Sequence, residues 1–537
     1  QVAPTHAHHN TALRVLYGSN GGSTQELAQK TTLKAQELGF KVTLAPMNDF
    51  ASGVFEAGTS SLFLCATYNG QPPDQSVAFM KFLHDTRSRH EMPLRGSSFA
   101  VFGCGNTQWA GTFQTVPITL DEGLEAVGCQ RAVTRYEGDS AADLEQVFEQ
   151  WLDVLWPALA SSHGLPLERV KATESRLPLP AVEVLTDGTA PVQMSLDFEG
   201  GAQQVHLAVN RELVGAGGDR SVRHLEFDLP LGESYKAGDH LAVYPENDPE
   251  LVAQLMGRLG LSEDVVVRLD FTPVFGSGDV RVVALKDWLR RAVDLSKGSG
   301  VSAIEYLASR ATLGLEQITL AAITKADHAQ RMQMPLLELL LKFPSVEVTL
   351  PEVLALLPQM KPRLYSVSSS PLALANRVSI SVGVLRGTTQ SGREHLGVCS
   401  NFLAALPVGA RVWVNVRDTG SSFRLPPPPT PMILVGPGTG LAPLRGFLQE
   451  LQHQRKSGIS VGAVHLFFGC RTTADFLYED ELRAFEADGT LTKLHVAFSR
   501  TGDKRYVQHV IKEEAAALWP VLKDGHVFVC GDASRMA

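Results

Sequence analysis

A length of 537 residues predicts three or four domains, each large enough to bury its own core. Hydrophobic residues make up 44% and charged residues 20%, and the chain has no apolar run long enough to span a membrane, which excludes a disordered chain and a transmembrane segment. The formal net charge is −9, which disfavours nucleic acid as a partner. Acidic residues outnumber basic ones over residues 12–160. This excess of negative charge suits either a solvated surface or the steering of a basic protein partner.

The six cysteines show no CxxC pair and no regular spacing, so neither a disulfide framework nor a zinc ribbon is indicated. A reducing, cytoplasmic setting fits best. We interpret residues 1–11, with His6, His8 and His9, as a flexible polar tail and assign no metal site. The chain begins at Gln1 without a signal-peptide pattern, and we interpret it as a piece of a longer protein. A homodimer is compatible with the sequence.

Short apolar segments alternate with helical patterns over residues 12–160. This alternation predicts a doubly wound parallel sheet, in which ligands bind beyond the carboxyl ends of the strands. The unusual Gly-rich and polar segments lie at those ends. Strands are expected at 13–18, 41–46, 61–67 and 98–103, and helices at 23–38, 75–88 and 141–155.

The first strand runs into a turn of hydroxyl-bearing residues and glycines at the start of a helix, a combination that suits a phosphomonoester. Tyr68 and Trp109 follow later strands of the same sheet, and a flat isoalloxazine ring fits between them. Considered alone, Trp109 could be a packing residue. The phosphate-type turn and the neighbouring Asn106 favour a role in binding the cofactor. The turn comprises Ser19, Asn20, Gly21, Gly22, Ser23 and Thr24.

Residues 161–190 are rich in Pro, Ala, Ser and Thr and predict a hinge. Alternating apolar and polar residues over 191–245, and again over 361–428, predict strands of one antiparallel β-barrel. Leu-rich helical spacing predicts a helical insertion over 246–360. Its helices are expected at 251–260, 284–294, 301–311, 335–342 and 351–357.

Two motifs of the barrel region suit a diphosphate and a ring. Arg363 and the helix that opens at 397–400 would clamp a diphosphate from two sides. Tyr365 would stack on a ring, and the Ser366 hydroxyl would reach a flavin nitrogen.

Residues 433–440, Ile-Leu-Val-Gly-Pro-Gly-Thr-Gly, form an apolar strand that breaks into a Gly-rich turn before a helix. Free backbone N–H groups at the helix start would hold a dinucleotide pyrophosphate, whereas an ordinary strand–helix connection is the alternative. Strand–helix alternation over 429–537 predicts a second doubly wound sheet. Its strands are expected near 432–436, 463–469, 493–498 and 526–530.

The segment after the strand at 493–498 indicates which nicotinamide dinucleotide binds. An NAD site would place an acidic residue on the ribose diol, whereas cations and hydroxyls suit a 2′-phosphate. A solvated basic loop is the alternative, and NADPH is the expected substrate. The residues in question are Ser499, Arg500, Lys504, Tyr506 and Gln508.

Eight motifs in order make the chain resemble the diflavin reductases, the family of cytochrome P-450 reductase, sulfite reductase flavoprotein and nitric oxide synthase reductase. The motifs are Tyr-Gly-Ser-Asn-Gly-Gly-Ser-Thr at 17–24, Phe-Gly-Cys-Gly-Asn-Thr-Gln-Trp at 102–109, Gly-Asp-His at 238–240, Arg-Leu-Tyr-Ser at 363–366, Gly-Val-Cys-Ser at 397–400, Gly-Pro-Gly-Thr-Gly at 436–440, Ala-Phe-Ser-Arg at 497–500 and Val-Cys-Gly-Asp at 529–532.

The resemblance implies three cofactor and nucleotide sites. FMN would lie on the turn 19–24 with Tyr68, Asn69, Gly70, Gly105, Asn106 and Trp109; FAD on Arg363, Tyr365, Ser366, Gly397, Val398, Cys399 and Ser400; and NADPH on Gly438 and Thr439 with the cations and hydroxyls after the strand at 493–498. Ser366 and Cys530 would flank the reacting flavin nitrogen and nicotinamide carbon.

Two features resemble those of the self-sufficient fatty-acid hydroxylases, in which a haem domain and a reductase form one polypeptide. They are the short loop Thr-Tyr-Asn-Gly-Gln-Pro-Pro-Asp at 67–74 and the tryptophan at position 109. The resemblance implies hydride transfer from NADPH to FAD, then single electrons to FMN and to a haem monooxygenase domain. The alternatives are a stand-alone reductase for sulfite reductase or another acceptor, and a flavin-binding module that is inactive in hydride transfer. The family's final helix, acid and aromatic would lie beyond Ala537, so we expect the NADPH-binding part to be truncated.

Overall fold

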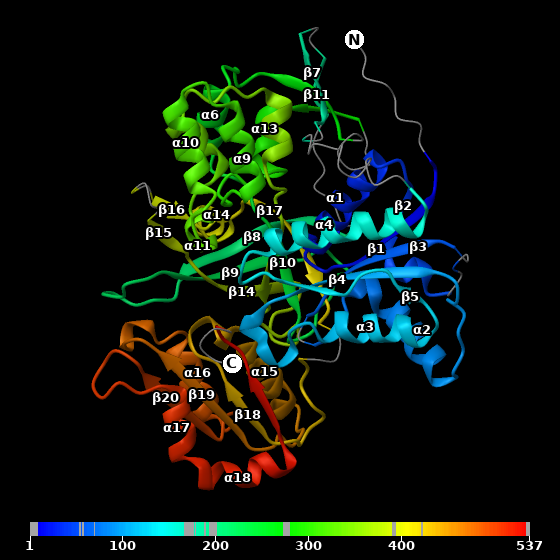
Figure 1. Ribbon diagram of the computed structural model, residues 1–537. Helices are drawn as coiled ribbons and strands as arrows, with labels where there is room; N and C mark the ends of the chain where they lie inside the picture. The colour runs from blue at the N-terminus through cyan, green and yellow to red at the C-terminus, as the bar shows by residue number, and fades with distance from the viewer. Residues whose placement is uncertain are drawn as a thin grey trace.

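The computed structural model describes residues 9–52, 55, 58–68, 70–165, 177, 179–186, 189–192, 201–271, 280–388, 392, 394–419 and 423–532. Asn69 and much of the expected hinge lie outside these ranges. Along the chain, a blue and cyan unit of sheet and helices is followed by green helices and a green and yellow sheet, and then by an orange and red unit (Figure 1). Each part buries its own hydrophobic residues.

The N-terminal unit is a sheet of strand order β2-β1-β3-β4-β5 whose pairs are parallel, with β6 beside β4. Alternate side chains of its central strands enter separate cores on the two faces, which confirms the expected doubly wound sheet. One helix was not expected, because Pro117 and Gly123 interrupt its apolar pattern. The elements are β1 (Ala12–Gly18), α1 (Ser23–Glu37), β2 (Lys41–Pro46), η1 (Met47–Phe50), β3 (Ser60–Ala66), η2 (Asp74–Ser76), α2 (Val77–Ser88), β4 (Ser98–Gly105), η3 (Thr107–Thr112), α3 (Thr115–Ala126), β5 (Gln130–Arg131), β6 (Tyr136–Asp139) and α4 (Leu144–Ser162).

The barrel takes strands from both stretches that the alternating pattern indicated. Its order is β13-β10-β17-β8-β9-β14 with antiparallel pairs, and a bridge between Val367 and Ile380 brings the two edges together. The inward side chains form one core. The elements are β8 (Gln203–Glu212), β9 (Val222–Asp228), β10 (His240–Tyr244), β13 (Arg363–Ser366), β14 (Arg377–Gly383), β15 (Arg386–Thr388), β16 (Glu394–Leu396), α14 (Val398–Ala405) and β17 (Arg411–Arg417).

The insertion between the barrel strands is mainly helical, with a Leu-rich core of its own. It also holds a small antiparallel sheet, β12-β11-β7, whose strand β7 comes from the segment expected as a hinge. The period-2 run Ala-Val-Glu-Val-Leu explains this strand, since Val182 packs against the insertion core. The elements are β7 (Ala181–Leu185), α6 (Pro249–Arg258), β11 (Val266–Asp270), β12 (Arg281–Ala284), α8 (Leu285–Arg291), α9 (Val301–Arg310), α10 (Gly314–Ile323), α11 (His328–Arg331), α12 (Leu336–Lys342) and α13 (Leu350–Leu356).

The C-terminal unit is a parallel sheet of order β20-β19-β18-β21, with helices between its strands, as the alternation predicted. Helix α15 is buried along much of its length because it packs against both this sheet and the barrel. The elements are β18 (Met432–Val435), η4 (Gly438–Gly440), α15 (Leu441–Lys456), β19 (Val464–Cys470), η5 (Thr473–Asp475), α16 (Glu479–Ala487), β20 (Lys493–Phe498), α17 (Val507–Glu513), α18 (Ala515–Asp524) and β21 (His526–Val529).

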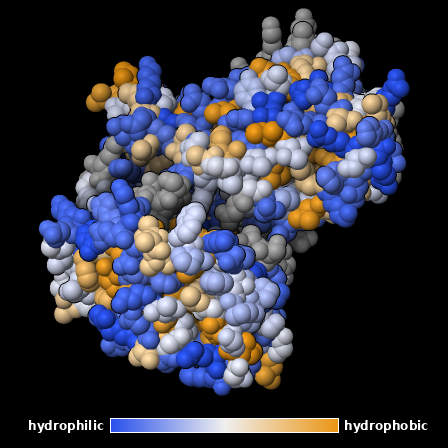
Figure 2. Space-filling model, turned by 90° about the horizontal axis from the view of Figure 1, so that it is seen from below, coloured by the Kyte–Doolittle hydropathy of each residue, from blue (hydrophilic) through white to orange (hydrophobic). Residues whose placement is uncertain are grey.

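The surface mixes polar and apolar residues. Seen from below, hydrophobic side chains are scattered among hydrophilic ones (Figure 2), as is usual for exposed apolar residues. Within the described ranges, none of the helices has both the length and the apolar character that crossing a bilayer requires.

Candidate flavin and nucleotide sites

The turn between β1 and α1 directs backbone N–H groups at one position. The Tyr68 hydroxyl accepts from the N–H groups of Asn20 at 3.3 Å and Gly21 at 3.0 Å. The Ser19 Oγ is buried and has no hydrogen-bond partner among the described residues. Two convergent donors, an unpaired buried hydroxyl and the start of a helix fit a phosphate group.

Three loops meet at this turn, as the sheet topology predicted. A Cβ built on Gly70 would lie 3.1 Å from Thr112 Cγ2, so the loop after β3 touches η3. Trp109, within η3, has non-helical φ and ψ angles of −106° and 57°, and 48% of its surface is exposed. The Asn106 side chain caps this segment by accepting from the Gln108 N–H group at 2.8 Å.

The Tyr68 side chain directs its hydroxyl at the phosphate turn, where it accepts from the N–H groups of Asn20 and Gly21. The phenol is a hydrogen-bond acceptor for free N–H groups, and this attraction sets its orientation here. Asn69, expected beside it, lies outside the described residues. Gly105 must be glycine, because a Cβ would lie 2.8 Å from the Phe113 ring.

The remaining turn residues lie at the start of α1. Gly22 is its N-cap, with a φ of 75° that favours glycine, and Thr24 is buried. The Ser23 Oγ accepts from Lys361 Nζ at 3.0 Å, and the same ammonium lies 2.9 Å from Glu26. A cation of the barrel part therefore reaches the expected FMN site, which the sequence pattern did not indicate.

The expected FAD residues of β13 are held by polar contacts. Arg363 donates to Asp294 at 2.9 Å and keeps 38% of its side-chain surface exposed. Tyr365 packs against the barrel core, and its hydroxyl interacts with the Cys399 thiol. Burial raises the pKa of Cys399 to about 12, so this thiol is a neutral packing group.

The turn before α14 brings its backbone close to neighbouring residues. A Cβ on Gly397 would lie 2.9 Å from Leu385 Cβ, so only glycine fits there. The Ser400 Oγ accepts from the Leu385 N–H at 3.0 Å, which fixes the helix start. Gly397 and Val398 present the backbone of a helix N-terminus, and the Cys399 and Ser400 side chains anchor it from behind.

The Gly-rich turn after β18 leaves little space around its backbone. Gly438 has a φ of 57°, and a Cβ on Gly440 would lie 2.0 Å from the carbonyl oxygen of Cys530. The Thr439 methyl faces Gly383 of the barrel. Arg220, which sequence reasoning missed, has its guanidinium about 4 Å from the Cβ position of Gly438, beside the expected pyrophosphate site.

The residues expected to bind the 2′-phosphate lie between the end of β20 and the first turn of α17. Ser499 follows β20 and donates to the Cys470 carbonyl at 3.2 Å. The Arg500 guanidinium pairs with Asp219 of the barrel at 2.7 Å. The same loop and the first turn of α17 carry three further exposed side chains: Lys504, Tyr506 and Gln508.

The two expected catalytic residues lie on different parts of the chain. Ser366 ends β13 of the barrel, whereas Cys530 follows β21 of the C-terminal sheet. Burial raises the pKa of the Cys530 thiol to about 11. The chain just after β13 packs on α15, since Arg445 donates to the Ser368 carbonyl at 2.6 Å, and this contact joins the two parts.

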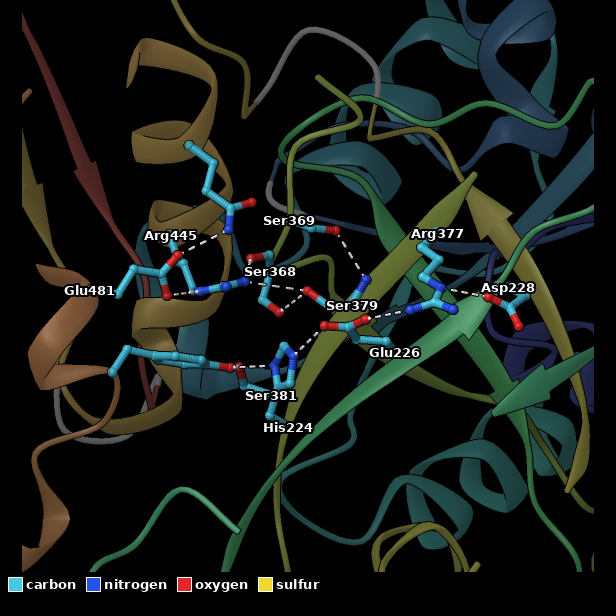
Figure 3. A network of polar contacts seen from close by, with 12 residues as sticks. His224, Glu226, Asp228, Ser368, Ser369, Arg377, Ser379, Ser381, Arg445 and Glu481 are labelled. Carbon is cyan, nitrogen blue, oxygen red and sulfur yellow. Dashed lines mark hydrogen bonds and ion pairs between the residues drawn. The ribbon is translucent and has the colours of Figure 1, made fainter. Parts of the chain in front are cut away.

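A buried polar network fixes that junction (Figure 3). Arg445 also pairs with Glu481 at 2.6 Å, and its guanidinium lies over the Tyr478 ring. The Tyr478 hydroxyl contacts His224 at 2.8 Å, and His224 contacts Glu226 at 3.1 Å. The network holds the barrel and the nucleotide-binding sheet in a fixed orientation.

A phosphomonoester turn, an antiparallel barrel with a second flavin site and a nucleotide-binding sheet define an oxidoreductase with two flavins. Three family models match the chain in that order: Flavodoxin over residues 15–151, FAD binding domain over 201–402, and Oxidoreductase NAD-binding domain over 434–537. The cofactors of this class are FMN and FAD, with NADPH as electron donor.

The chain belongs to the diflavin reductase family. It is 32% identical to an NADPH–cytochrome P450 reductase of Oryctolagus cuniculus and 31% identical to one of Dictyostelium discoideum, over 97% and 98% of this chain and 82% and 83% of those proteins. It is 36% identical to a bifunctional cytochrome P450/NADPH–P450 reductase of Bacillus subtilis (strain 168), over 98% of this chain and 50% of that protein. The chain thus spans about half the length of the fused relatives.

Proposed function

We propose that this chain is the reductase part of a fused, cytoplasmic haem monooxygenase and takes electrons from NADPH for a haem domain. Fused relatives at 35–37% identity support the fusion. When bound, FAD and FMN would supply the conversion of the electron pair that NADPH delivers into the single electrons that a haem accepts.

The chain's own residues would bind and orient these groups. The turn 19–24 would hold the FMN phosphate, with Tyr68 and Trp109 about the ring, and Arg363 with the backbone of Gly397 and Val398 would hold the FAD diphosphate. Ser366 and Cys530 would lie around the reacting atoms. The turn at Gly438 and Thr439 would bind the NADPH pyrophosphate.

The domain limits are part of the proposal. Residues 12–160 would form the FMN domain, 191–245 with 361–428 the FAD domain, 246–360 the connecting insertion, and 429–537 the NADPH domain. The segment 161–190 would join the first two.

The observation that carries the two-flavin proposal is the convergence of the Asn20 and Gly21 N–H groups on one acceptor position, far along the chain from Arg363. Its test is flavin extraction from the purified protein. We expect one FMN and one FAD per chain, and bleaching when NADPH is added without oxygen. One flavin per chain would reject the proposal, whereas two flavins that NADPH does not bleach would favour a flavin-binding module.

A stand-alone reductase is the second candidate, because the chain covers 82% and 83% of two relatives that are named as reductases alone. The sequence of the gene upstream of residue 1 separates the two. A haem-domain sequence there supports the fusion, and a stop codon close upstream rejects it.

A further inference from the structure

The loop between β8 and β9 leaves the barrel and lies on the nucleotide-binding sheet. Gly215 N–H donates to the Ala474 carbonyl at 2.7 Å, and Arg220 Nε pairs with Asp475 at 2.6 Å. Asp475 is only 1% exposed, so this pair anchors the loop. The position of the loop therefore does not depend on its exposed tip.

At that tip, Asp219 bridges two guanidinium groups. Its Oδ1 lies 2.8 Å from Arg471 and its Oδ2 lies 2.7 Å from Arg500. Hydrogen bonding to Arg471, and the charges of both arginines, lower the pKa of Asp219. The carboxylate is thus ionised at neutral pH and holds both cations.

The two arginines lie where a nucleotide is expected to present its 2′-phosphate. Arg471 follows β19 and Arg500 follows β20, which are neighbouring parallel strands, and the Arg500 N–H donates to the Arg471 carbonyl at 2.9 Å. Ligands of such sheets bind at this edge. A carboxylate with one oxygen on each guanidinium occupies the positions that two phosphate oxygens would take.

We propose that Asp219 competes with the 2′-phosphate of NADPH for Arg500 and Arg471, and so sets how strongly this chain prefers NADPH over NADH. The inference rests on the proposed use of NADPH. A 2′-phosphate must displace the carboxylate from the arginines and then bind beside its negative charge. A dinucleotide without that phosphate leaves the pair in place, so Asp219 weakens the binding of NADPH selectively.

The test measures binding of 2′,5′-ADP and of 5′-AMP to the full chain with both flavins, by isothermal titration calorimetry. Asp219→Asn removes the charge but keeps the size of the side chain. We expect it to tighten 2′,5′-ADP binding about two- to fivefold, the range for an exposed ion pair, and to leave 5′-AMP unchanged. The gain should shrink at high ionic strength, because the charges are exposed.

Asp264→Asn, an exposed carboxylate of the insertion, is the matched control and should change neither affinity. Asp219→Ser, with a small neutral side chain, should act in the same direction as Asp219→Asn. Unchanged or weaker binding of 2′,5′-ADP to both Asp219 variants would overturn the inference, since a carboxylate that orients the arginines gives that result. If the unsubstituted chain binds the two ligands equally, the NADPH proposal itself fails.

Discussion

At the scale of single residues, two tyrosines expected beside flavin rings also hold polar contacts through their hydroxyl groups. Tyr68 accepts from the N–H groups of Asn20 and Gly21, and Tyr365 interacts with Cys399. A phenol ring can stack and a phenol oxygen can accept, so the two roles are chemically separable. Substitutions that keep the ring and remove the oxygen distinguish them.

Tyr68→Phe tests this separation at the FMN site. The phenylalanine keeps the ring but no longer accepts from the phosphate turn, so FMN affinity should stay the same or rise. Tyr68→Ala removes the ring and should weaken FMN binding about two- to tenfold. Fluorescence titration of FMN into flavin-free protein measures both, with Tyr306→Phe in the insertion as the control. Equal losses in Tyr68→Phe and Tyr68→Ala would contradict a stacking role.

His224 predicts a pH dependence of stability. Burial, together with the charges of Arg445 and Arg211, lowers the pKa of this histidine from 6.5 to about 4. Between these values the unfolded chain binds a proton that the folded chain does not, so stability is full above about pH 6.5 and falls as the pH falls toward 4. The loss is at most about 3 kcal/mol.

The measurement for His224 is the urea midpoint at about pH 7 and pH 5. His224→Asn should lower the midpoint at neutral pH and give a shallower decline on acidification. His453→Asn, an exposed histidine of α15, is the control and should keep the original slope. An unaltered slope in His224→Asn would show that another group carries the dependence.

At the scale of elements, the strand–turn–helix unit after β18 is limited by the space around its glycines. The carbonyl oxygen of Cys530 occupies the position where a Cβ of Gly440 would be, because β21 continues beside the turn. The backbone of the turn therefore packs directly against the backbone at the end of β21, which leaves no room for a side chain at position 440.

Gly440→Ala should displace the turn or the end of β21. We expect a loss of about 1–3 kcal/mol in the free energy of unfolding and weaker binding of NADP⁺, which carries the pyrophosphate. Gly257→Ala in α6 is the matched control, since its Cβ meets no atom within 4 Å and alanine favours a helix. Urea denaturation and calorimetry measure the two effects. Binding that is unchanged in Gly440→Ala would argue against a pyrophosphate at this turn.

At the scale of the whole molecule, the N-terminal unit docks on the barrel and insertion through charged contacts. Lys361 pairs with Glu26 at 2.9 Å, and Arg331 of α11 pairs with Asp143, the N-cap of α4. Burial alone would raise the pKa of Glu26, but the charges of Lys361, Lys30 and Lys297 lower it to about 2. The docked arrangement thus depends on an ionised Glu26.

Lys361→Gln should shift the molecule toward separated units, because Glu26 then lacks its nearest cation. Small-angle X-ray scattering should show a larger radius of gyration. The control is Lys81→Gln, which breaks an exposed ion pair with Asp85 within α2 and should leave the radius of gyration unchanged. Protonation of Glu26 acts in the same direction: its contribution to docking is present above about pH 4.5 and is lost as the pH falls toward 2. An unchanged radius in Lys361→Gln would show that other contacts hold the units together.

The amino-acid pattern alone was enough to predict the order of sheets, barrel and insertion, and the two Gly-rich turns. These features depend on local periodicity and on backbone requirements that neighbouring residues reveal. The small sheet that includes β7 and the helix α3 escaped prediction, because short runs and a proline within a helix give weak periodic signals.

Which charged groups meet depends on the folded chain and could not be predicted from local patterns. Asp219 and Arg500 are 281 residues apart, and Lys361 and Ser23 are 338 residues apart. An exposed aspartate or lysine has the same local pattern whether it faces water or a distant partner, so no spacing rule selects the pair. Chain topology brings such groups together, and for that reason the pairing of Asp219 with two arginines and the contacts of the N-terminal unit became visible only in three dimensions.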